Sequence, residues 1–239
     1  MSESVNEAYS NIAKQIITGK QTSCCDDSCC GDDQQVMELK DLPRSIPSLG
    51  SDKDLIGFAK PQKGETVVDL GSGPGRDVLN FAREVGSTGY VIGIDFSDDM
   101  IELAKKHASE AEITNVEFRK GSIEHMPVDS ESIDLIISNC VINLADNKEN
   151  VFISSYKILK DGGRIVFSDL VVKDIISEKL TNDIDAVCGC FAGTTKQSYI
   201  HMLKKAGFKD VKAYNEYEFT KEFNGSDIEY TSTIFQAIK

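Results

Sequence analysis

Short apolar runs alternate with stretches of helical spacing between residues 65 and 172. Each apolar run has the length and composition of a buried parallel strand. The five runs are, in order, "ETVVDLG", "YVIGIDF", "NVEFRKG", "SIDLIISN" and "RIVFSDLVV". Helical spacing is carried by "RDVLNFAREVG", by "SDDMIELAKKHASEA" with Ser97 as its N-cap, and by "KENVFISSYKILKDGG" with a glycine stop. This alternation predicts βαβ units, and therefore an α/β fold with a doubly wound, mostly parallel sheet.

Before this alternation, residues 3–18 predict a helix ending at Gly19, and residues 51–60 predict a short helix capped by Ser51. The Cys-rich stretch "TSCCDDSCC" lies between them. We expect residues 1–50 to cover the active site as an N-terminal extension and residues 51–173 to form the cofactor-binding domain.

After the alternation, we expect helices near 177–188 and 195–206. Residues 210–219 and 229–239 have strand character with no clear helix between them, which predicts an antiparallel hairpin at one edge of the sheet. We expect residues 174–239, which contain these elements, to form a substrate-side region and sheet edge.

The composition argues against some partners. The chain has 239 residues and a formal net charge of −13, and Lys204-Lys205 is its nearest approach to a basic cluster. A nucleic-acid or anionic-membrane surface needs clustered cations, so we expect neither partner. No apolar stretch has the length of a transmembrane helix, and residues 1–10 lack the pattern of a secretory signal. We therefore expect a cytoplasmic monomer with reduced thiols.

A glycine loop follows the first predicted strand. "VVDLGSGPGRD" places Gly71, Gly73 and Gly75 where the chain turns from strand to helix, and Asp95 ends the next strand. Glycine allows a sharp turn and a close approach of a ligand to the backbone. In doubly wound sheets this edge binds cofactors, and a carboxylate at the end of the second strand can accept from both ribose hydroxyls of an adenosine.

Two cofactors compete for this loop, and a purely structural turn is the third alternative. A dinucleotide site usually has the motif G-x-G-x-x-G, but Arg76 occupies the position of the third glycine here. Asp69, just before the loop, would repel a pyrophosphate and attract an ammonium. S-adenosylmethionine carries an ammonium and a sulfonium and has no phosphate, so this pattern favours it.

The acceptor atom is suggested by what the chain lacks. Methylation of oxygen or nitrogen often needs a general base, and none of His107, His125 and His201 shows the pattern of an oriented base. At the end of the fourth predicted strand stands Cys140, in "SNCVINL". Buried cysteine is usually a small hydrophobic residue, so a core role is the alternative to a functional one.

Other cysteines occur in two further segments, at Cys188 and Cys190 and in the cluster of Cys24, Cys25, Cys29 and Cys30. The cluster has three interpretations. A disulfide knot conflicts with a reducing compartment, and C-C-x3-C-C is not a usual zinc spacing. In the third interpretation, these thiols bind a thiophilic substrate and take part in its redox chemistry by forming a disulfide.

The stretch from residue 65 to 239 resembles the class I S-adenosylmethionine-dependent methyltransferases. The resemblance implies a Rossmann-like sheet of seven strands whose last strand is antiparallel. It also implies that "GSIEHMP" holds the adenine and that Met100 packs on the adenine face, although Met100 taken alone suits the core. The predicted cofactor contacts are Asp69, Gly71, Gly73, Gly75, Arg76, Asp95, Phe96, Met100, Ser122, Ile123, Glu124 and Asn139.

"SNCVINLADNKENVFISSYKILKDGGRIVFSDLVV", followed by "CGCFAGT", resembles the arsenite S-adenosylmethionine methyltransferases more specifically. This resemblance implies that trivalent arsenic is bound by Cys140, Cys190 and Cys25 or Cys24. Cys188, Cys29 and Cys30 are additional to the family's set.

The chemistry of arsenic agrees with this hypothesis. Soft thiolates suit trivalent arsenic, and the lone pair left on arsenic is the nucleophile, so no general base is needed. Arsenite and methylated arsenicals would be its ligands, and thioredoxin or glutathione would re-reduce a disulfide formed after transfer. The alternatives are a methyltransferase for a small carbon or oxygen acceptor and a non-catalytic, thiol-rich metal or metalloid binder.

Overall fold

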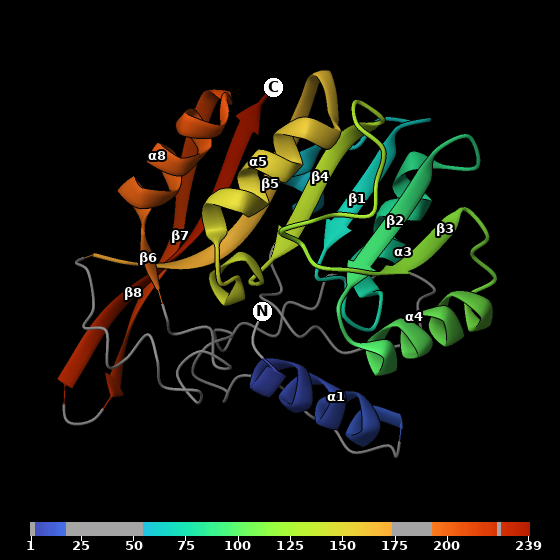
Figure 1. Ribbon diagram of the computed structural model, residues 1–239, viewed down its shortest axis with the longest axis horizontal. Helices are drawn as coiled ribbons and strands as arrows, with labels where there is room; N and C mark the ends of the chain where they lie inside the picture. Colours follow the sequence, from blue (N-terminus) through green and yellow to red (C-terminus); the bar gives the residue numbers. More distant parts are fainter. Residues whose placement is uncertain (1–2, 18–54, 174–192, 224–225) are drawn as a thin grey trace.

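The computed structural model describes residues 3–17, 55–173, 193–223 and 226–239. A twisted sheet of eight strands runs through the middle of the molecule (Figure 1). Its order is β3-β2-β1-β4-β5-β8-β7, with β6 pairing β5 off this path. The strands are β1 Thr66–Leu70, β2 Tyr90–Asp95, β3 Val116–Lys120, β4 Ile133–Asn139, β5 Leu159–Val172, β6 Thr194–Thr195, β7 Lys209–Phe223 and β8 Ser226–Ile238.

The strand directions confirm the predicted α/β class. Strands β1 to β5 pair in parallel, whereas β8 is antiparallel to β5 and β7 is antiparallel to β8. The predicted closing hairpin is therefore present at one edge, and the last strand is antiparallel. The predicted number of seven strands was one short, because the two-residue β6 also pairs with Val171 and Val172 of β5.

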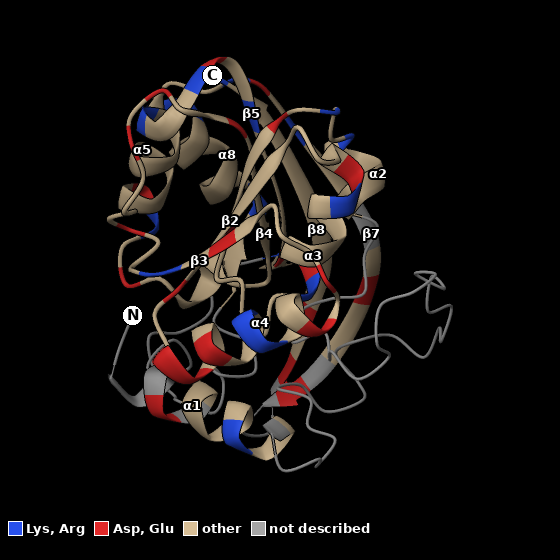
Figure 2. Cartoon of the chain, turned by 90° about the vertical axis from the view of Figure 1, so that its right-hand side faces the viewer, with Lys and Arg blue, Asp and Glu red and all other residues tan. Residues whose placement is uncertain are grey.

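Helices cover both faces of the sheet. They are α1 Glu3–Ile17, α2 Leu55–Ala59, α3 Arg76–Val85, α4 Asp98–Glu110, α5 Lys148–Ile158 and α8 Lys196–Ala206, with a 3₁₀ turn η1 at Ile142–Leu144. The side view separates α5 and α8 on one face from α2 and α3 on the other (Figure 2). Burial of apolar strand faces against these helices is the main favourable contribution to folding.

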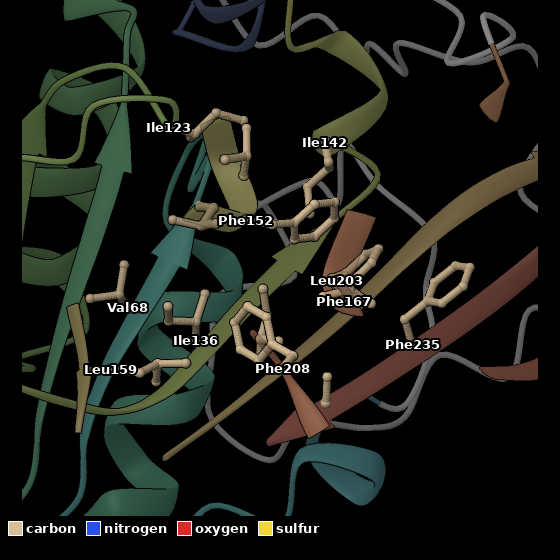
Figure 3. Close-up of a cluster of buried hydrophobic side chains, with 14 of the residues drawn as sticks. Val68, Ile123, Ile136, Ile142, Phe152, Leu159, Phe167, Leu203, Phe208 and Phe235 are labelled. Carbon is tan, nitrogen blue, oxygen red and sulfur yellow. The ribbon is translucent and has the colours of Figure 1, made fainter. Parts of the chain in front are cut away.

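Aromatic rings fill the core on the α5–α8 face (Figure 3). Phe167 of β5 stacks on Phe235 of β8 with ring centroids 4.8 Å apart, and Tyr199 of α8 lies 5.4 Å from Phe167. Phe152 of α5 completes the cluster at 5.5 Å from Phe167. Large rings at these positions join both helices to β5, the strand that carries one side of the site described below.

The predicted third helix ends earlier than its glycines suggested. Helix α5 stops at Ile158, and Leu159 has extended backbone angles of φ −67° and ψ 140°. Leu159 is fully buried and pairs with Ile133 of β4, so its burial in the sheet outweighs the helical spacing. Gly162, with φ 78°, lies within β5, at the irregularity in its pairing with β4 between Leu159 and Arg164, and not at the helix end.

The other helix predictions agree with the structure where it describes them. Ser97 caps α4, accepting from the backbone N–H of Met100. Helix α8 begins after Thr195, whose hydroxyl accepts from the N–H of Ser198. The predicted caps at Gly19 and Ser51 and the predicted helix at 177–188 lie outside the described residues.

Helix α1 packs against α4, at the side of the molecule shown lowest in Figure 1. The hydroxyls of Ser10 and Ser97 are 3.2 Å apart, and Lys14 Nζ lies 3.6 Å from Asp99 Oδ2. This contact brings a segment from the start of the chain to the carboxyl edge of β2.

Candidate active site

The carboxyl ends of β1, β2 and β4 meet at one cavity, the place where open α/β sheets bind ligands. It is lined by the ends of these strands, the loops that follow them, the loop after β3, the first turn of α3 and one residue of α1. The lining comprises Tyr9, Asp69, Gly71, Ser72, Gly73, Pro74, Arg76, Asp77, Asp95, Phe96, Gly121, Ile123, Asn139, Cys140, Val141 and Leu144.

The glycine loop requires glycine at its first turn. Gly71 has φ 72°, and a Cβ added there would lie 2.4 Å from Cγ1 of Val141. Gly75 has φ 90° and stands at the start of α3, where it offers no side-chain cap. The loop therefore packs closely against Val141, the residue that follows Cys140. The first residues of α3 lie at the edge of the cavity.

Three carboxyl groups converge on the cavity: Asp69, Asp77 and Asp95. Burial, and then the charges of Asp77 and Asp95, raise the pKa of Asp69 well above its usual value. Burial raises the pKa of Asp95 to about 6, although hydrogen bonds from the backbone oppose that rise. Such a pocket favours a cationic ligand, because a positive charge would relieve the mutual repulsion.

Backbone N–H groups hold the carboxylate of Asp95. The N–H of Gly73 donates to Oδ2 and the N–H of Ser97 donates to Oδ1, both at 2.9 Å. The glycine loop and the cap of α4 are thus joined through one carboxylate at the end of β2.

Ser72, a residue of the cavity lining, carries a buried polar group that a ligand could engage. Its side chain is buried, and its Oγ has no hydrogen-bond partner among the described residues. An unsatisfied buried hydroxyl is costly, and this one belongs to the cavity lining. A ligand with polar groups at this position would satisfy it.

Cys140 lies on the β4 side of the cavity. It is 7% exposed, and its backbone has φ 58°, which is in the left-handed region. Its N–H donates to the carbonyl of Ser168 on β5 at 2.8 Å. A non-glycine residue in this conformation costs free energy and is concentrated at functional sites.

Nine of the sequence-predicted site residues line the cavity together: Asp69, Gly71, Gly73, Arg76, Asp95, Phe96, Ile123, Asn139 and Cys140. Gly75, Met100, Ser122 and Glu124 are outside its lining. Met100 is fully buried on α4, which corresponds to the core alternative considered for it.

The carboxylate of Glu124 is engaged away from the cavity. Its Oε1 accepts from the N–H of Asp146 at 3.1 Å and of Asn147 at 3.3 Å. Ser122 Oγ accepts from the N–H of Glu124 and shapes the same turn. These two polar side chains therefore stabilise the loop that carries Ile123 to the cavity.

The other predicted thiol ligands, Cys24, Cys25 and Cys190, lie outside the described residues, as do Cys29, Cys30 and Cys188. Over 3–17, 55–173, 193–223 and 226–239, no group of three His, Cys, Asp or Glu residues has a geometry that could hold a metal ion. The three-thiol set thus stays a prediction.

Several lining residues were missed by the sequence reasoning. Ser72, Pro74 and Asp77 lie within the quoted loop, and their place beside its glycines was the available signal. Tyr9 comes from α1 and has no local signal of this kind. Only the packing of α1 on α4 brings it to the cavity.

The model of a family described as "Methyltransferase domain" matches residues 61–207, which contain every lining residue except Tyr9. The chain belongs to this methyltransferase family. Among curated relatives, an arsenite methyltransferase of Halobacterium salinarum is 37% identical over 92% of this chain and 60% of its own length. One of Aquipseudomonas alcaligenes is 32% identical over 88% of this chain and 62% of its own length. This methyltransferase therefore spans about 60% of the length of these relatives.

Solved structures give the same fold. An arsenic(III) S-adenosylmethionine methyltransferase from Chlamydomonas reinhardtii superposes with a TM-score of 0.65 and 29% identity, covering 75% of this chain and 65% of its own. A phosphoethanolamine N-methyltransferase from Haemonchus contortus gives 0.63 at 18% identity over 77% and 51% of the two chains, which shows the fold alone. No helix among the described residues of this methyltransferase is both long and apolar enough to cross a membrane.

Proposed function

We propose that this methyltransferase transfers methyl groups from S-adenosylmethionine to thiolate-bound trivalent arsenic. The observation that carries the proposal is that Cys140 lines the same cavity as the glycine loop and the carboxylates of Asp69 and Asp95. A soft nucleophile-binding group and a site for a cationic donor thus share one pocket. The similarity to arsenite methyltransferases over most of the chain supports the same acceptor.

The cavity fits S-adenosylmethionine chemically. Asp69 and Asp77 would hold its ammonium, Asp95 its ribose hydroxyls, and Ser72 would gain a partner for its buried hydroxyl. When bound, the cofactor supplies a methyl group on a cationic sulfur. The glycine loop excludes water and fixes the position of the donor, which is the main contribution that a protein makes to such a transfer.

Cys140 would be one of the arsenic ligands. Its strained backbone and its bond to Ser168 hold the residue at the cavity. Cys190 and Cys25 or Cys24 complete the set in this proposal, since three thiolates leave a lone pair on arsenic. A general base is then unnecessary. Methyl transfer to the lone pair would leave pentavalent arsenic, and two thiolates would reduce it to trivalent arsenic by forming a disulfide. Thioredoxin or glutathione would then reduce that disulfide, and a cytoplasmic monomer is the form we expect to act.

The test is turnover of the reduced 239-residue chain under anaerobic conditions with S-adenosylmethionine, arsenite and a thiol reductant, followed by separation of arsenic species. We expect methylated arsenic from the wild type. We expect none above background from Cys140→Ser, whose affinity for the cofactor should stay within about twofold of the wild type. Ser155→Ala, on the α5 face away from the lining, serves as a control that removes one buried hydroxyl.

Two results would contradict the proposal. Cofactor binding without methylated arsenic, under both thioredoxin and glutathione, would favour a carbon or oxygen acceptor. Undiminished arsenite methylation by Cys140→Ser would remove this thiol from the reaction.

A further inference from the structure

A buried polar network lies behind the loop that carries Cys140. Asn143, Asp169 and Tyr199 are its members, and each is at most 3% exposed. Asn143 Nδ2 donates to Asp169 Oδ1 at 2.7 Å, and the backbone N–H of Asn143 donates to Asp169 Oδ2 at 3.0 Å. The hydroxyl of Tyr199 lies 2.8 Å from Asp169 Oδ2 and 2.9 Å from Asn143 Oδ1.

The network joins three segments that are far apart in the sequence. Asn143 belongs to η1, directly after the Cys140 turn, whereas Asp169 lies near the end of β5 and Tyr199 on α8. The amide of Asn143 also donates to the carbonyl of Leu170 at 2.8 Å. Its Oδ1 lies 3.4 Å from the N–H of Thr194 in β6, four residues after Cys190. The hydrogen bonds of Asn143 therefore join the turn at Cys140 to β6, which begins four residues after Cys190.

Cys140 itself lies within electrostatic range of this network. The charged form of Cys140 contributes to raising the pKa of Tyr199, after burial and Asp169. The charge of Lys148 on α5 opposes the rise in the pKa of Asp169 that burial causes, and Asp146 and Glu124 are the other charges acting on Lys148. None of the three network residues lines the cavity, so their influence on a ligand must pass through the Cys140 turn.

Packing alone does not explain these side chains. A buried carboxyl among aromatic rings loses its hydration, and apolar residues of similar volume often stabilise a core as well or better. The network instead fixes the orientation of Asn143, because its side-chain amide and its backbone N–H all have defined partners. It holds in place a turn whose first residue has a left-handed backbone at φ 58°.

We propose that Asn143, Asp169 and Tyr199 are positioning residues that hold Cys140 at the cavity for arsenic binding. This inference rests on the proposed function for its role in turnover, whereas its geometric content concerns Cys140 alone. Loss of the network should leave the cofactor pocket intact and loosen the thiol.

Tyr199→Phe in the 239-residue chain tests this, because it removes one hydroxyl and keeps the ring. Tyr156→Phe is the matched control, since Tyr156 lies on the same face and its ring packs against Phe208. The readout is the rate of alkylation of Cys140 by iodoacetamide. The tryptic peptide from Gly121 to Lys148 contains Cys140 as its single cysteine, so mass spectrometry can follow it separately from the six others.

We expect Cys140 to be alkylated about fivefold or more faster in Tyr199→Phe than in the wild type, since local opening controls access to a buried thiol. The affinity for S-adenosylmethionine should stay within about twofold, and kcat/KM for arsenite should fall about tenfold, mainly through KM. Tyr156→Phe should match the wild type in all three measurements.

Asn143→Ala is the second variant and keeps the test decisive if Tyr199→Phe is poorly folded. Unchanged alkylation and unchanged arsenite KM in both variants, with a lowered Tm, would show a purely structural network and overturn the proposal. Faster alkylation confined to Tyr199→Phe and Asn143→Ala supports it. A wild type that does not methylate arsenite would refute the proposed function, and the alkylation rates would still decide whether the network positions Cys140.

Discussion

The side-chain amide of Asn139 donates to the carboxylate of Asp77 across 3.2 Å, and so joins the end of β4 to the first turn of α3. Asn139 immediately precedes Cys140, and Asp77 is one of the two charges that raise the pKa of Asp69. One hydrogen bond thus connects the predicted donor pocket with the position of the predicted acceptor thiol. Four predictions follow from the surrounding geometry.

Asp69→Asn should weaken cofactor binding about tenfold or more, because it removes the buried charge that faces a cationic ligand. The same change should raise the Tm of the ligand-free protein at pH 7. The raised pKa of Asp69 means that its contribution to stability is present at low pH and is lost as the pH rises through the folded-state pKa. Calorimetry and thermal unfolding at pH 4 and 7 check both parts. A Tm advantage that is as large at pH 4 as at pH 7 would contradict the electrostatic explanation.

Cofactor affinity should fall as the pH is lowered from 7 to 5. The pKa of Asp95 is about 6, so its carboxylate gains a proton in this range and loses acceptor capacity for ribose hydroxyls. Asp69, whose pKa is also raised, adds to the same trend. Binding constants measured at intervals of half a pH unit test this. Asp95→Asn should bind weakly at pH 7 and show a flatter profile; an equally steep profile in the variant would assign the pH dependence to Asp69.

Gly71→Ala should destabilise the protein by about 2–5 kcal/mol, from the left-handed backbone together with overlap of the new methyl with Val141. It should also reduce cofactor affinity, since the loop cannot keep its path. Gly162→Ala is the control, because Gly162 also has a positive φ, of 78°, but has open space around a Cβ. That variant should lose about 1–2 kcal/mol and keep its affinity. Denaturant unfolding and calorimetry distinguish the two, and equal affinity in both variants would refute a role for the loop's close packing.

Arg164→Ala should lower the unfolding free energy by about 2–4 kcal/mol without changing cofactor affinity. Its guanidinium is bidentate to Glu65, at 2.7 and 3.0 Å, and also donates to the carbonyls of Ala59 and Lys60. In this variant the carboxylate of Glu65, which is partly buried, loses its ion-pair partner. Lys205→Ala breaks the exposed pair with Glu149 and should cost less than about 0.5 kcal/mol. Similar losses in both variants, measured by urea unfolding, would show that burial does not distinguish these ion pairs.

The regular part of the fold was predictable because it depends on local patterns. The runs around Val68, Ile92 and Ile136 have the apolar length of parallel strands, and the structure places them side by side in β1, β2 and β4. The end of α5 was not predictable in this way. Leu159 continues the helical spacing, but its pairing with Ile133 in the sheet stabilises an extended conformation. The two-residue β6 also escaped prediction, since it exists only through its pairing with β5.

The residues of the candidate site also differ in how far local sequence predicts their positions. Asp69, Asp95 and Cys140 end predicted strands, so their convergence followed from the rule that parallel strands present their carboxyl ends at one edge. Glu124, a predicted cofactor contact, does not line the cavity. Its neighbour Ile123 lines the cavity, whereas the longer carboxylate reaches the backbone of Asp146 and Asn147. Side-chain direction within a loop depends on partners that local sequence does not specify.

By itself, the sequence determined the α/β class, the parallel strands with their antiparallel closing hairpin, and the edge at which a cofactor and a thiol would meet. These follow from hydrophobic period and from glycine chemistry, which act over a few residues. The tertiary structure alone decided that Tyr9 reaches the cavity, that Asn139 bonds to Asp77, and that Tyr199 and Asp169 lie behind Cys140. Such contacts join segments separated by 30 residues or more in the chain. Their geometry is set by how the helices pack on the sheet, which no local pattern encodes.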